Sequence, residues 1–358
     1  MTVLICIADH FEPLRGGATI TTARERVARW VRGYPELALP FADSRGRPPQ
    51  HTFFYPAEEY QPELLDTLAG LCQQGLGDVE VHLHHDHDTA SALCEKLLTF
   101  TAALNDQHGL LARDEADRVT YGFIHGNWAL DNSRPDGRWC GVNEEISVLL
   151  QTGCYADFTM PSAPAPCQTR TINSIYYAHD DPARPKSHDV GIPARVGARR
   201  PDDSLLMIQG PLALDFSRRK HGFLPTIDNG ELTGIRPPTL SRLWNWLGAR
   251  VCVLGQPDLR FVKLHTHGAW EANTSMLLGE PMRAFHAALR AHANIHDGFR
   301  YYYVTARELA AVVDALEKFP MAASRFDEYW RTAATLRQGS FDPFTVPGGA
   351  DCTPIARR

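Results

Sequence analysis

The sequence lacks the patterns that would place it in several common protein classes. It has eight cysteines but no Cys-x-x-Cys pair, which argues against a disulfide framework and against a zinc site built from paired thiolates. No apolar run approaches the ~18 residues that cross a bilayer. The net charge is -6, and no long run of Lys and Arg offers a track for phosphates. We therefore expect neither a nucleic-acid partner nor a membrane anchor.

The amino-terminal sequence MTVLICIADH contains a short apolar run, but no basic region precedes it and no cleavage motif follows it. We interpret this run as the first strand of the fold and expect a cytoplasmic protein. No strand-like segment leads into a nucleotide-binding glycine motif, which disfavours a doubly wound dinucleotide-binding sheet. The sequence contains no signal for the oligomeric state.

Strand-like and helix-like segments alternate along the first half of the chain. The run at 2–8 is apolar throughout, as in a strand buried on both faces, whereas 21–34 has apolar residues at helical spacing. This alternation predicts an α/β fold with a parallel sheet, and the polar residues that end several strands favour a (β/α) barrel. Strands are predicted at 2–8, 51–56, 78–84, 118–126 and 154–160, and helices at 21–34, 62–75, 90–105 and 143–153.

The alternation stops between about 164 and 236, where Pro, Arg, Asp and Gly dominate and 204–210 is the one clear apolar strand. We interpret this stretch as an insertion over one face of the barrel. The sequence therefore predicts a single catalytic domain over 1–337 and an irregular tail over 338–358. Within the later part, helices are predicted at 239–250, 280–292, 306–319 and 323–336, and strands at 259–268 and 300–305.

The segment VEVHLHHDHDT at 79–89 is rich in potential metal ligands. Strand parity puts its apolar residues on one face and Glu80, His82 and His84 on the other. His84 falls at the carboxyl end of the strand, where the active sites of barrels lie. If a helix follows directly, Asp88 returns to the same side one turn later. We therefore predict His84 and Asp88 as ligands, with His82 lying deeper.

Two other predicted strands end in the same kinds of residue. Asp9 and His10 follow the first strand in IADHFEP, and Lys263, His265 and His267 share one face of VKLHTHG. Three strands that are remote in sequence thus bring His or Asp to one rim of the predicted barrel. A solvated charged loop does not account for that coincidence. The sequence therefore predicts a site for a divalent metal ion, with Zn²⁺ as the expected ion.

These motifs, in this order, resemble the polysaccharide deacetylase superfamily, the carbohydrate esterases similar to the nodulation chitooligosaccharide deacetylase. That family has an acidic pair after its first strand, a strand resembling Thr-Phe-Phe, a His-x-x-x-His motif and a late Leu-x-His. Here the corresponding segments are ADHFEP, TFF at 52–54, EVHLHHDHD and KLH. The resemblance covers roughly residues 2–160 and 258–268. It implies a distorted seven-stranded deacetylase-type (β/α) barrel.

The resemblance also implies roles for individual residues. Asp9 corresponds to the catalytic base, and His265 corresponds to the acid that protonates the leaving amine. Asp157, in the aspartate strand GCYADF, is expected to tune His265 by hydrogen bonding. The family's metal ligands are one Asp and two His, and three residues form the same set here in another order: His10, His84 and Asp88.

The segment FIHGNW at 123–128 stands where the family has an Arg-Pro motif in its substrate groove. The arginine is missing here. His125, Asn127 and Trp128 are therefore the residues expected to contact substrate, with His267 on the rim formed by the late strand. A tryptophan at this position is suited to stacking on a sugar ring.

Two imidazoles and one carboxylate would hold a divalent ion and leave positions open for water and a carbonyl oxygen. Such an ion lowers the pKa of bound water toward ~7 and polarises an acyl group. The sequence therefore predicts a metal-dependent hydrolase that deacylates an N-acylated sugar or a related amide. Two alternatives stay open. One is a metallohydrolase of the amidohydrolase or phosphoesterase type that uses His82 and His84. The other is a non-catalytic carbohydrate-binding relative that keeps the metal.

Overall fold

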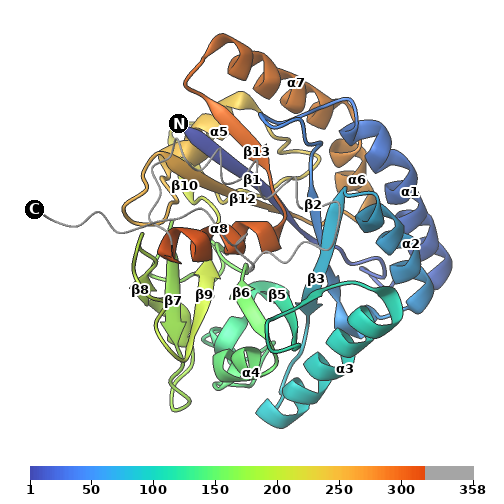
Figure 1. The fold of residues 1–358 in the computed structure, drawn as a ribbon, viewed down its shortest axis with the longest axis vertical. Helices are drawn as coiled ribbons and strands as arrows, with labels where there is room; N and C mark the ends of the chain where they lie inside the picture. Colours follow the sequence, from blue (N-terminus) through green and yellow to red (C-terminus); the bar gives the residue numbers. More distant parts are fainter. Residues whose placement is uncertain (319–358) are drawn as a thin grey trace, which may run out of the picture.

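A computed structural model describes residues 1–318, which form a mixed α/β fold around a mostly parallel sheet (Figure 1). The order of the parallel strands in the sheet is β12-β1-β2-β3-β5-β6-β9. Ala8 is paired with His265 on one side and with Thr52 on the other, so the carboxyl ends of β1 and β12 lie level and the start of β2 lies beside the end of β1. The parallel strands are β1 (Thr2–His10), β2 (His51–Pro56), β3 (Gly77–Leu83), β5 (Val119–His125), β6 (Cys154–Asp157), β9 (Ser204–Ile208) and β12 (Leu259–Thr266).

Shorter strands extend this sheet or stand apart from it. β7 (Ile175–His179) runs antiparallel to β9, β8 (Ile192–Pro193) is antiparallel to β7, and β4 (Ala112–Arg113) is antiparallel to β5. β13 (Arg300–Tyr303) pairs in parallel with the start of β1. β10 (Ala213–Lys220) and β11 (Leu224–Asp228) form a separate hairpin. The predicted insertion at 164–236 therefore contributes β9 to the parallel sheet and holds four further strands.

Helices α1, α2, α3 and α7 cover one face of the sheet, which we call the outer face, and α8 packs on the inner face. α1 begins after Thr19, whose hydroxyl accepts a hydrogen bond from the Thr22 backbone N–H, and it buries Val27 and Trp30 against the strands. α1, α2 and α3 lie side by side along β1, β2 and β3 (Figure 1). The helices are α1 (Ile20–Ala38), α2 (Pro62–Gln73), α3 (Ala90–His108), α4 (Glu145–Gln151), α5 (Leu240–Gly248), α6 (Glu271–Leu277), α7 (Glu280–Ile295) and α8 (Ala306–Lys318). Short 3-10 turns are η1 (Ala57–Glu59), η2 (Gly126–Trp128), η3 (Leu130–Asn132) and η4 (Ser187–Asp189).

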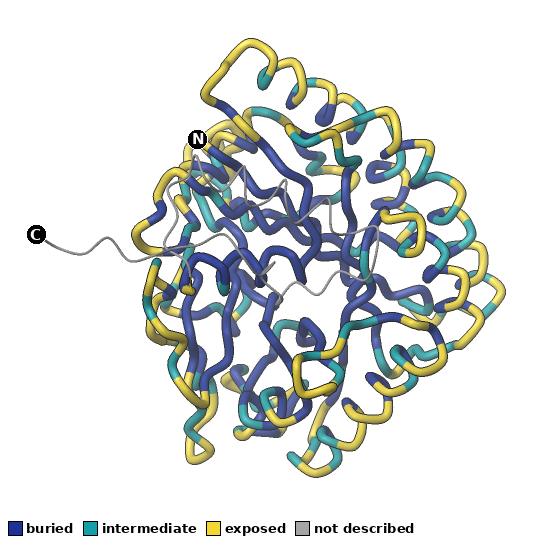
Figure 2. The backbone as a smooth tube through the Cα atoms, viewed as in Figure 1, coloured by how far each residue is buried: buried dark blue, intermediate teal, exposed yellow. Residues whose placement is uncertain are grey.

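Alternate residues of β1 belong to two different apolar clusters, as strand parity requires. Val3, Ile5 and Ile7 pack with the helices α1, α2 and α7, and the even-numbered residues pack on the inner face with α8. The buried strands and the exposed outer turns of the helices are distinct in Figure 2. Each large apolar side chain buried in this way contributes about 1.5–3 kcal/mol to stability. On the inner face the apolar column of β1 ends at His10.

The α/β class and the parallel sheet are as predicted from the sequence. Within residues 1–318, no helix has the length and apolar character needed to cross a bilayer. The helix predicted at 323–336 and the tail predicted at 338–358 lie outside the described residues.

Candidate metal centre

Three strand ends bring pairs of potential ligands together. β1, β3 and β12 each carry two such residues, two positions apart, at or just beyond the carboxyl end. The centroid of the His10 ring lies 4.9 Å from that of His82 and 4.8 Å from that of His267. The pairs are His10 with Glu12, His82 with His84, and His265 with His267. We use the name mouth cluster for His10, Glu12, His82, His84 and His267.

Glu12 lies at the centre of the mouth cluster. Its Oε1 is 3.3 Å from His82 Nε2 and 3.2 Å from His84 Nε2. The potential ligand atoms of these three residues lie within 4.8 Å of one another, and the same is true of His10, Glu12 and His267. Glu12 therefore belongs to two groups of three, each of which is arranged to hold a metal ion.

Hydrogen bonds orient two of the imidazole rings toward Glu12. His82 Nδ1 donates to the carbonyl oxygen of Ile124 at 2.8 Å, and His84 Nδ1 donates to Glu58 Oε1 at 2.5 Å. With Nδ1 directed at these acceptors, the Nε2 atom of each ring faces Glu12 and offers a lone pair whenever the ring is neutral. Metal-binding histidines are commonly oriented in this way by a carbonyl or a carboxylate.

The histidines of the mouth cluster differ in charge at neutral pH. Burial, together with nearby imidazoles, lowers the pKa of His10 well below its usual value, and burial lowers the pKa of His267 to about 4. These rings are neutral and can act as ligands. Burial also disfavours the charged form of His84, but hydrogen bonds with Glu12 and Glu58 outweigh it and raise its pKa to about 9. The carboxylates thus favour a positive charge beside Glu12.

An open cavity of about 230 Å³ lies over the mouth cluster. Arg15 donates to Glu12 Oε2 at 2.5 Å and holds this carboxylate in place. Burial and the charges of Glu12 and Glu58 raise the pKa of Glu59 to about 7, although the Leu14 N–H opposes this. The cavity therefore contains a carboxyl group suited to proton transfer near neutrality. Its lining residues are His10, Glu12, Arg15, Glu59, His84, Asn127, Trp128 and His267.

The structure brings several of the sequence-predicted site residues to this cavity. These residues are His10, His84, Asn127, Trp128 and His267. The predicted acid His265 lies deeper, with its ring centroid 6.3 Å from that of His10, and its buried Nε2 has no hydrogen-bond partner among the described residues. Burial lowers the pKa of His265 well below its usual value, so this ring is neutral at pH 7.

Asp9, the predicted base, is not brought to the mouth cluster. β1 continues through His10, so Asp9 and His10 point to opposite faces of the strand. The fully buried Asp9 carboxylate lies 2.9 Å from His51 Nε2 through Oδ2, and its Oδ1 accepts a hydrogen bond from the Gly268 N–H. Asp9 thus links β1 to β2 and to the turn after β12, on the helix side of the sheet.

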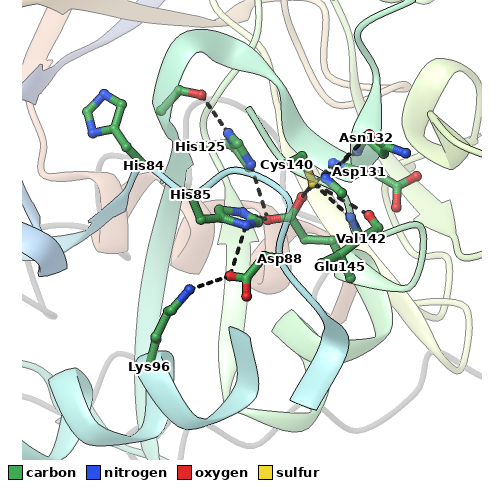
Figure 3. Close-up of polar contacts among 12 residues, drawn as sticks. His84, His85, Asp88, Lys96, His125, Asp131, Asn132, Cys140, Val142 and Glu145 are labelled. Atoms are coloured by element: carbon green, nitrogen blue, oxygen red, sulfur yellow. Dashed lines mark hydrogen bonds and ion pairs between the residues drawn. The ribbon is translucent and has the colours of Figure 1, made fainter. Parts of the chain in front are cut away.

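Asp88, the predicted third ligand, is also separated from His84. A helix directly after His84 would have brought them together, but α3 begins only at Ala90, with Thr89 as its N-cap. Asp88 Oδ2 instead lies 2.6 Å from Lys96 Nζ and 3.2 Å from His85 Nδ1. In Figure 3, His84 points away from this group.

The predicted substrate contact His125 lies in that second group and not in the mouth. Its Nε2 is 3.5 Å from Glu145 Oε1, and its ring centroid is 4.7 Å from that of His85 (Figure 3). The potential ligand atoms of four buried residues lie within 4.8 Å of one another. These residues are His85, His125, Cys140 and Glu145, which we call the buried cluster.

Asp157 does not contact His265. Its carboxylate accepts hydrogen bonds from the backbone N–H and the hydroxyl of Thr159, and burial raises its pKa to about 7. Lys263 Nζ donates to the carbonyl oxygens of Phe158 and Met160. Asp157 and Lys263 therefore fix the chain after β6 in the interior.

Sequence reasoning missed Glu12, Glu58 and Glu59 at the mouth, and Cys140 and Glu145 in the buried cluster. A signal for Glu12 was present, because HFE at 10–12 has the same spacing as HLH at 82–84 and HTH at 265–267. Three such i, i+2 pairs at three strand ends indicate one common site. The residues of the buried cluster have no shared spacing.

No family profile matches the chain, and no curated protein matches it. Among solved structures, the chain is similar to the 4-alpha-glucanotransferase from Thermococcus litoralis, with a TM-score of 0.43 and 12% sequence identity. That alignment covers 94% of this chain and 46% of the other, so the chain spans just under half of that protein.

Proposed function

We propose that this protein is a metal-dependent hydrolase that binds its ion in the mouth cluster, and that its sheet is the wall of a distorted seven-stranded deacetylase-type (β/α) barrel. One observation carries the proposal. Glu12 Oε1 lies within 3.3 Å of two imidazole Nε2 atoms whose Nδ1 atoms are both occupied by acceptors. When both rings are neutral, two lone pairs and a carboxylate converge on one point, and an ion bound there would displace the proton that Glu12 and Glu58 favour on His84 in the metal-free protein.

The donor set fits a zinc-type ion. Tetrahedral bonds of about 2.0–2.3 Å place neighbouring ligand atoms roughly 3.3–3.7 Å apart, and the two distances from Glu12 to His82 and His84 are close to this range. The ligands would be these three residues, with His10 and His267 as donors on the opposite side of Glu12. When bound, such an ion lowers the pKa of water and polarises the carbonyl of the scissile bond.

The remaining residues of the cavity suit acyl transfer to water. Glu59 lies in the cavity with a pKa of about 7, so it exchanges a proton readily at neutral pH, and we propose it in place of Asp9 as the proton-transfer group. Burial disfavours the charge on Glu12, but hydrogen bonds with His82 and His84 outweigh it and hold its pKa low, and the ion pair with Arg15 fixes the carboxylate in place. Asn127 and Trp128 provide a hydrogen-bonding amide and a flat apolar face on the same wall.

The substrate that we propose is an N-acylated sugar or a related small amide. The resemblance to polysaccharide deacetylases supports this class, and an open cavity with an aromatic wall is suited to a pyranose ring. A second candidate is a two-metal phosphoester hydrolase. Glu12 favours it, because a carboxylate shared by two groups of three ligands can bridge two ions in such enzymes.

The test combines metal analysis with a substrate screen. Protein saturated with zinc is assayed against N-acetylated sugars, carboxylic esters and phosphodiesters, alongside Glu12→Gln. Glu63→Gln, at an exposed glutamate of α2 that pairs with Arg24, is the matched control. We expect amide hydrolysis in wild type and in the control, and loss of both activity and mouth-bound metal in Glu12→Gln. Phosphodiester hydrolysis with two ions at the mouth would favour the second candidate. Full metal binding without hydrolysis of any substrate would favour the carbohydrate-binding alternative.

A further inference from the structure

The buried cluster is separate from the mouth cluster, although the two begin at adjacent residues. His84 lies in the mouth, and His85 points into the space between β3, β5 and α4 (Figure 3). His85 follows β3, His125 ends β5, Cys140 lies in the loop before α4, and Glu145 is the first residue of α4. All four side chains are buried. Four segments that are far apart in sequence thus bring metal-ligating groups into the interior.

The distances between these groups match the edges of a metal coordination shell. Glu145 Oε1 lies 3.1 Å from His85 Nε2 and 3.5 Å from His125 Nε2, and Glu145 Oε2 lies 3.3 Å from Cys140 Sγ. Tetrahedral zinc with bonds of about 2.0–2.3 Å requires ligand atoms roughly 3.3–3.7 Å apart. The cluster therefore needs only small adjustments to surround an ion.

Both histidines direct Nε2 into the cluster. His125 Nδ1 donates to the Gly126 carbonyl oxygen at 2.6 Å, which leaves Nε2 unprotonated in the neutral ring. His85 Nδ1 lies 3.2 Å from Asp88 Oδ2, and this carboxylate is itself held by Lys96. A carboxylate behind a ligating imidazole is a common support for metal-bound histidine.

Two backbone N–H groups are directed at the sulfur of Cys140. Its Sγ accepts hydrogen bonds from the backbone N–H groups of Asn132 at 3.2 Å and Val142 at 3.4 Å. Backbone donors aimed at sulfur are typical of metal-bound cysteines, because the ligating form is the anion. Without a cation, burial and the Glu145 carboxylate, 3.3 Å away, raise the pKa of the Cys140 thiol far above its usual value. The ligating thiolate would therefore form only together with a bound cation.

Two features of the cluster remain unexplained without a cation. His125 Nε2 is fully buried and has no hydrogen-bond partner among the described residues. His85 Nδ1 is also buried without a hydrogen-bond partner among the described residues, because its Nε2 is the atom that bonds to Glu145 Oε1 at 3.1 Å. A divalent ion would supply a partner for both imidazoles and would compensate the buried negative charge.

We propose that the buried cluster is a second, structural zinc site, with His85, His125, Cys140 and Glu145 as its four ligands. Two neutral imidazoles, one thiolate and one carboxylate with Zn²⁺ have zero net charge, which suits complete burial. Four protein ligands leave no position for water or substrate, as in zinc sites that stabilise a fold. Soft and borderline donors of this kind select zinc over magnesium or calcium.

The site would fix the loop that forms one wall of the mouth cavity. Residues 126–144 connect β5 to α4 with only two short 3-10 turns, and five non-glycine residues in this loop have positive φ angles. Such a loop gains little from regular backbone hydrogen bonding and needs other restraints. His125 and Glu145 flank the loop, and Cys140 lies within it. An ion bound by them would hold Asn127 and Trp128 in place at the cavity.

The test measures zinc and uses cobalt as a spectroscopic probe. Protein with Glu12→Gln, which weakens the mouth site, should retain one equivalent of tightly bound zinc, and Cys140→Ser should lose that equivalent. Cys167→Ser is the matched control, because Cys167 is also a buried, free cysteine outside the cluster. After replacement of zinc by Co²⁺, wild type, Glu12→Gln and Cys167→Ser should each show a sulfur-to-cobalt charge-transfer band.

The cobalt measurement needs only well-folded proteins, so it decides the matter even if Cys140→Ser does not fold. The absence of the sulfur-to-cobalt band in wild type would overturn the proposal. Equal zinc content in Cys140→Ser and wild type would overturn it as well. If Glu12→Gln loses hydrolase activity but retains one equivalent of zinc, the mouth cluster and the buried cluster bind separate ions. If the protein proves to have no hydrolase activity, the zinc content and the cobalt spectrum still test the buried cluster.

Discussion

Replacing Glu58 by Gln changes the charge beside His84 but keeps an oxygen that can accept the hydrogen bond from His84 Nδ1. In the metal-free protein, burial lowers the pKa of His84, and the hydrogen bonds with Glu12 and Glu58 outweigh burial, so that the pKa is raised from 6.5 to about 9. A nearby opposite charge shifts a pKa by about 1–3 units. Because the Glu58 side chain is 36% exposed, solvent screens its charge. We therefore expect the pKa of His84 to fall by about 1 unit in Glu58→Gln.

The same change has a defined effect on stability. A histidine whose pKa is raised in the folded state stabilises the fold fully below its unfolded pKa, and this contribution is lost as the pH rises through the folded value. The window for His84 therefore runs from about pH 6.5 to about pH 9. At pH 7 the metal-free Glu58→Gln protein should be less stable than wild type by about 1 kcal/mol after discounting for screening. Above this window the difference should vanish.

Two measurements check this prediction in metal-free protein. Titration of the histidine ring signals by nuclear magnetic resonance gives the pKa of His84, and urea unfolding at the two ends of the window gives the free energies. Glu63→Gln serves as the control for loss of a partly exposed glutamate. An unchanged His84 pKa in Glu58→Gln, or a stability difference that persists above the window, would refute the electrostatic account of the mouth.

Three further predictions concern single residues and the metal. Asp9→Asn should lower the free energy of unfolding by about 1–3 kcal/mol, because the buried partner of His51 is weakened. Metal content and turnover per folded molecule should stay unchanged. Loss of turnover in a stable, metal-loaded variant would restore Asp9 as the base. Glu59→Gln should reduce hydrolysis by about 10²–10⁴-fold and remove the pH-dependent step near 7, and an unaltered pH profile would exclude Glu59. Zinc at about 100 times its Kd should stabilise chelator-treated protein by ~2.7 kcal/mol per site in thermal unfolding, and a curve that zinc does not move would contradict both metal sites.

Strand parity predicted correctly which histidines lie on the inner face of the sheet. The alternation of apolar and polar residues assigned His82, His84 and His267 to the inner face, and the structure brings all three to Glu12 or His10. The parallel sheet followed from the alternation of buried runs and amphipathic segments. These features depend on local periodicity, which a single sequence contains.

The assignments that failed depended on where an element ends. Asp9 would face the mouth only if β1 ended before it, but two backbone pairings extend the strand to His10. Asp88 would return to His84 only if a helix began at once, whereas the chain bends through 84–89 before α3. An error of one or two residues at an element boundary is common, and in a strand each single step reverses the direction of the side chain.

The buried cluster could not have been predicted from local pattern at all. His85 and Cys140 lie in two loops, His125 at a strand end and Glu145 at a helix start, and the backbone of residues 126–144 has no regular period. Their approach depends on the parallel pairing of β3 with β5 and on the position of α4. Long-range packing of this kind is invisible to spacing rules, whereas Glu12 shares a spacing with two other pairs and could have been found.

The adjacent residues His84 and His85 explain why one segment supplies two sites. β3 ends at Leu83, and the two residues directly after it diverge: His84 lies at the cavity, and His85 lies in the buried cluster. A histidine at each position therefore serves a different cluster, one open to the cavity and one closed. The closed cluster fixes the loop whose Asn127 and Trp128 face the open one. An ion at the buried cluster would thus influence substrate binding by fixing the position of that loop. An ion at the mouth would instead polarise the scissile bond of the substrate.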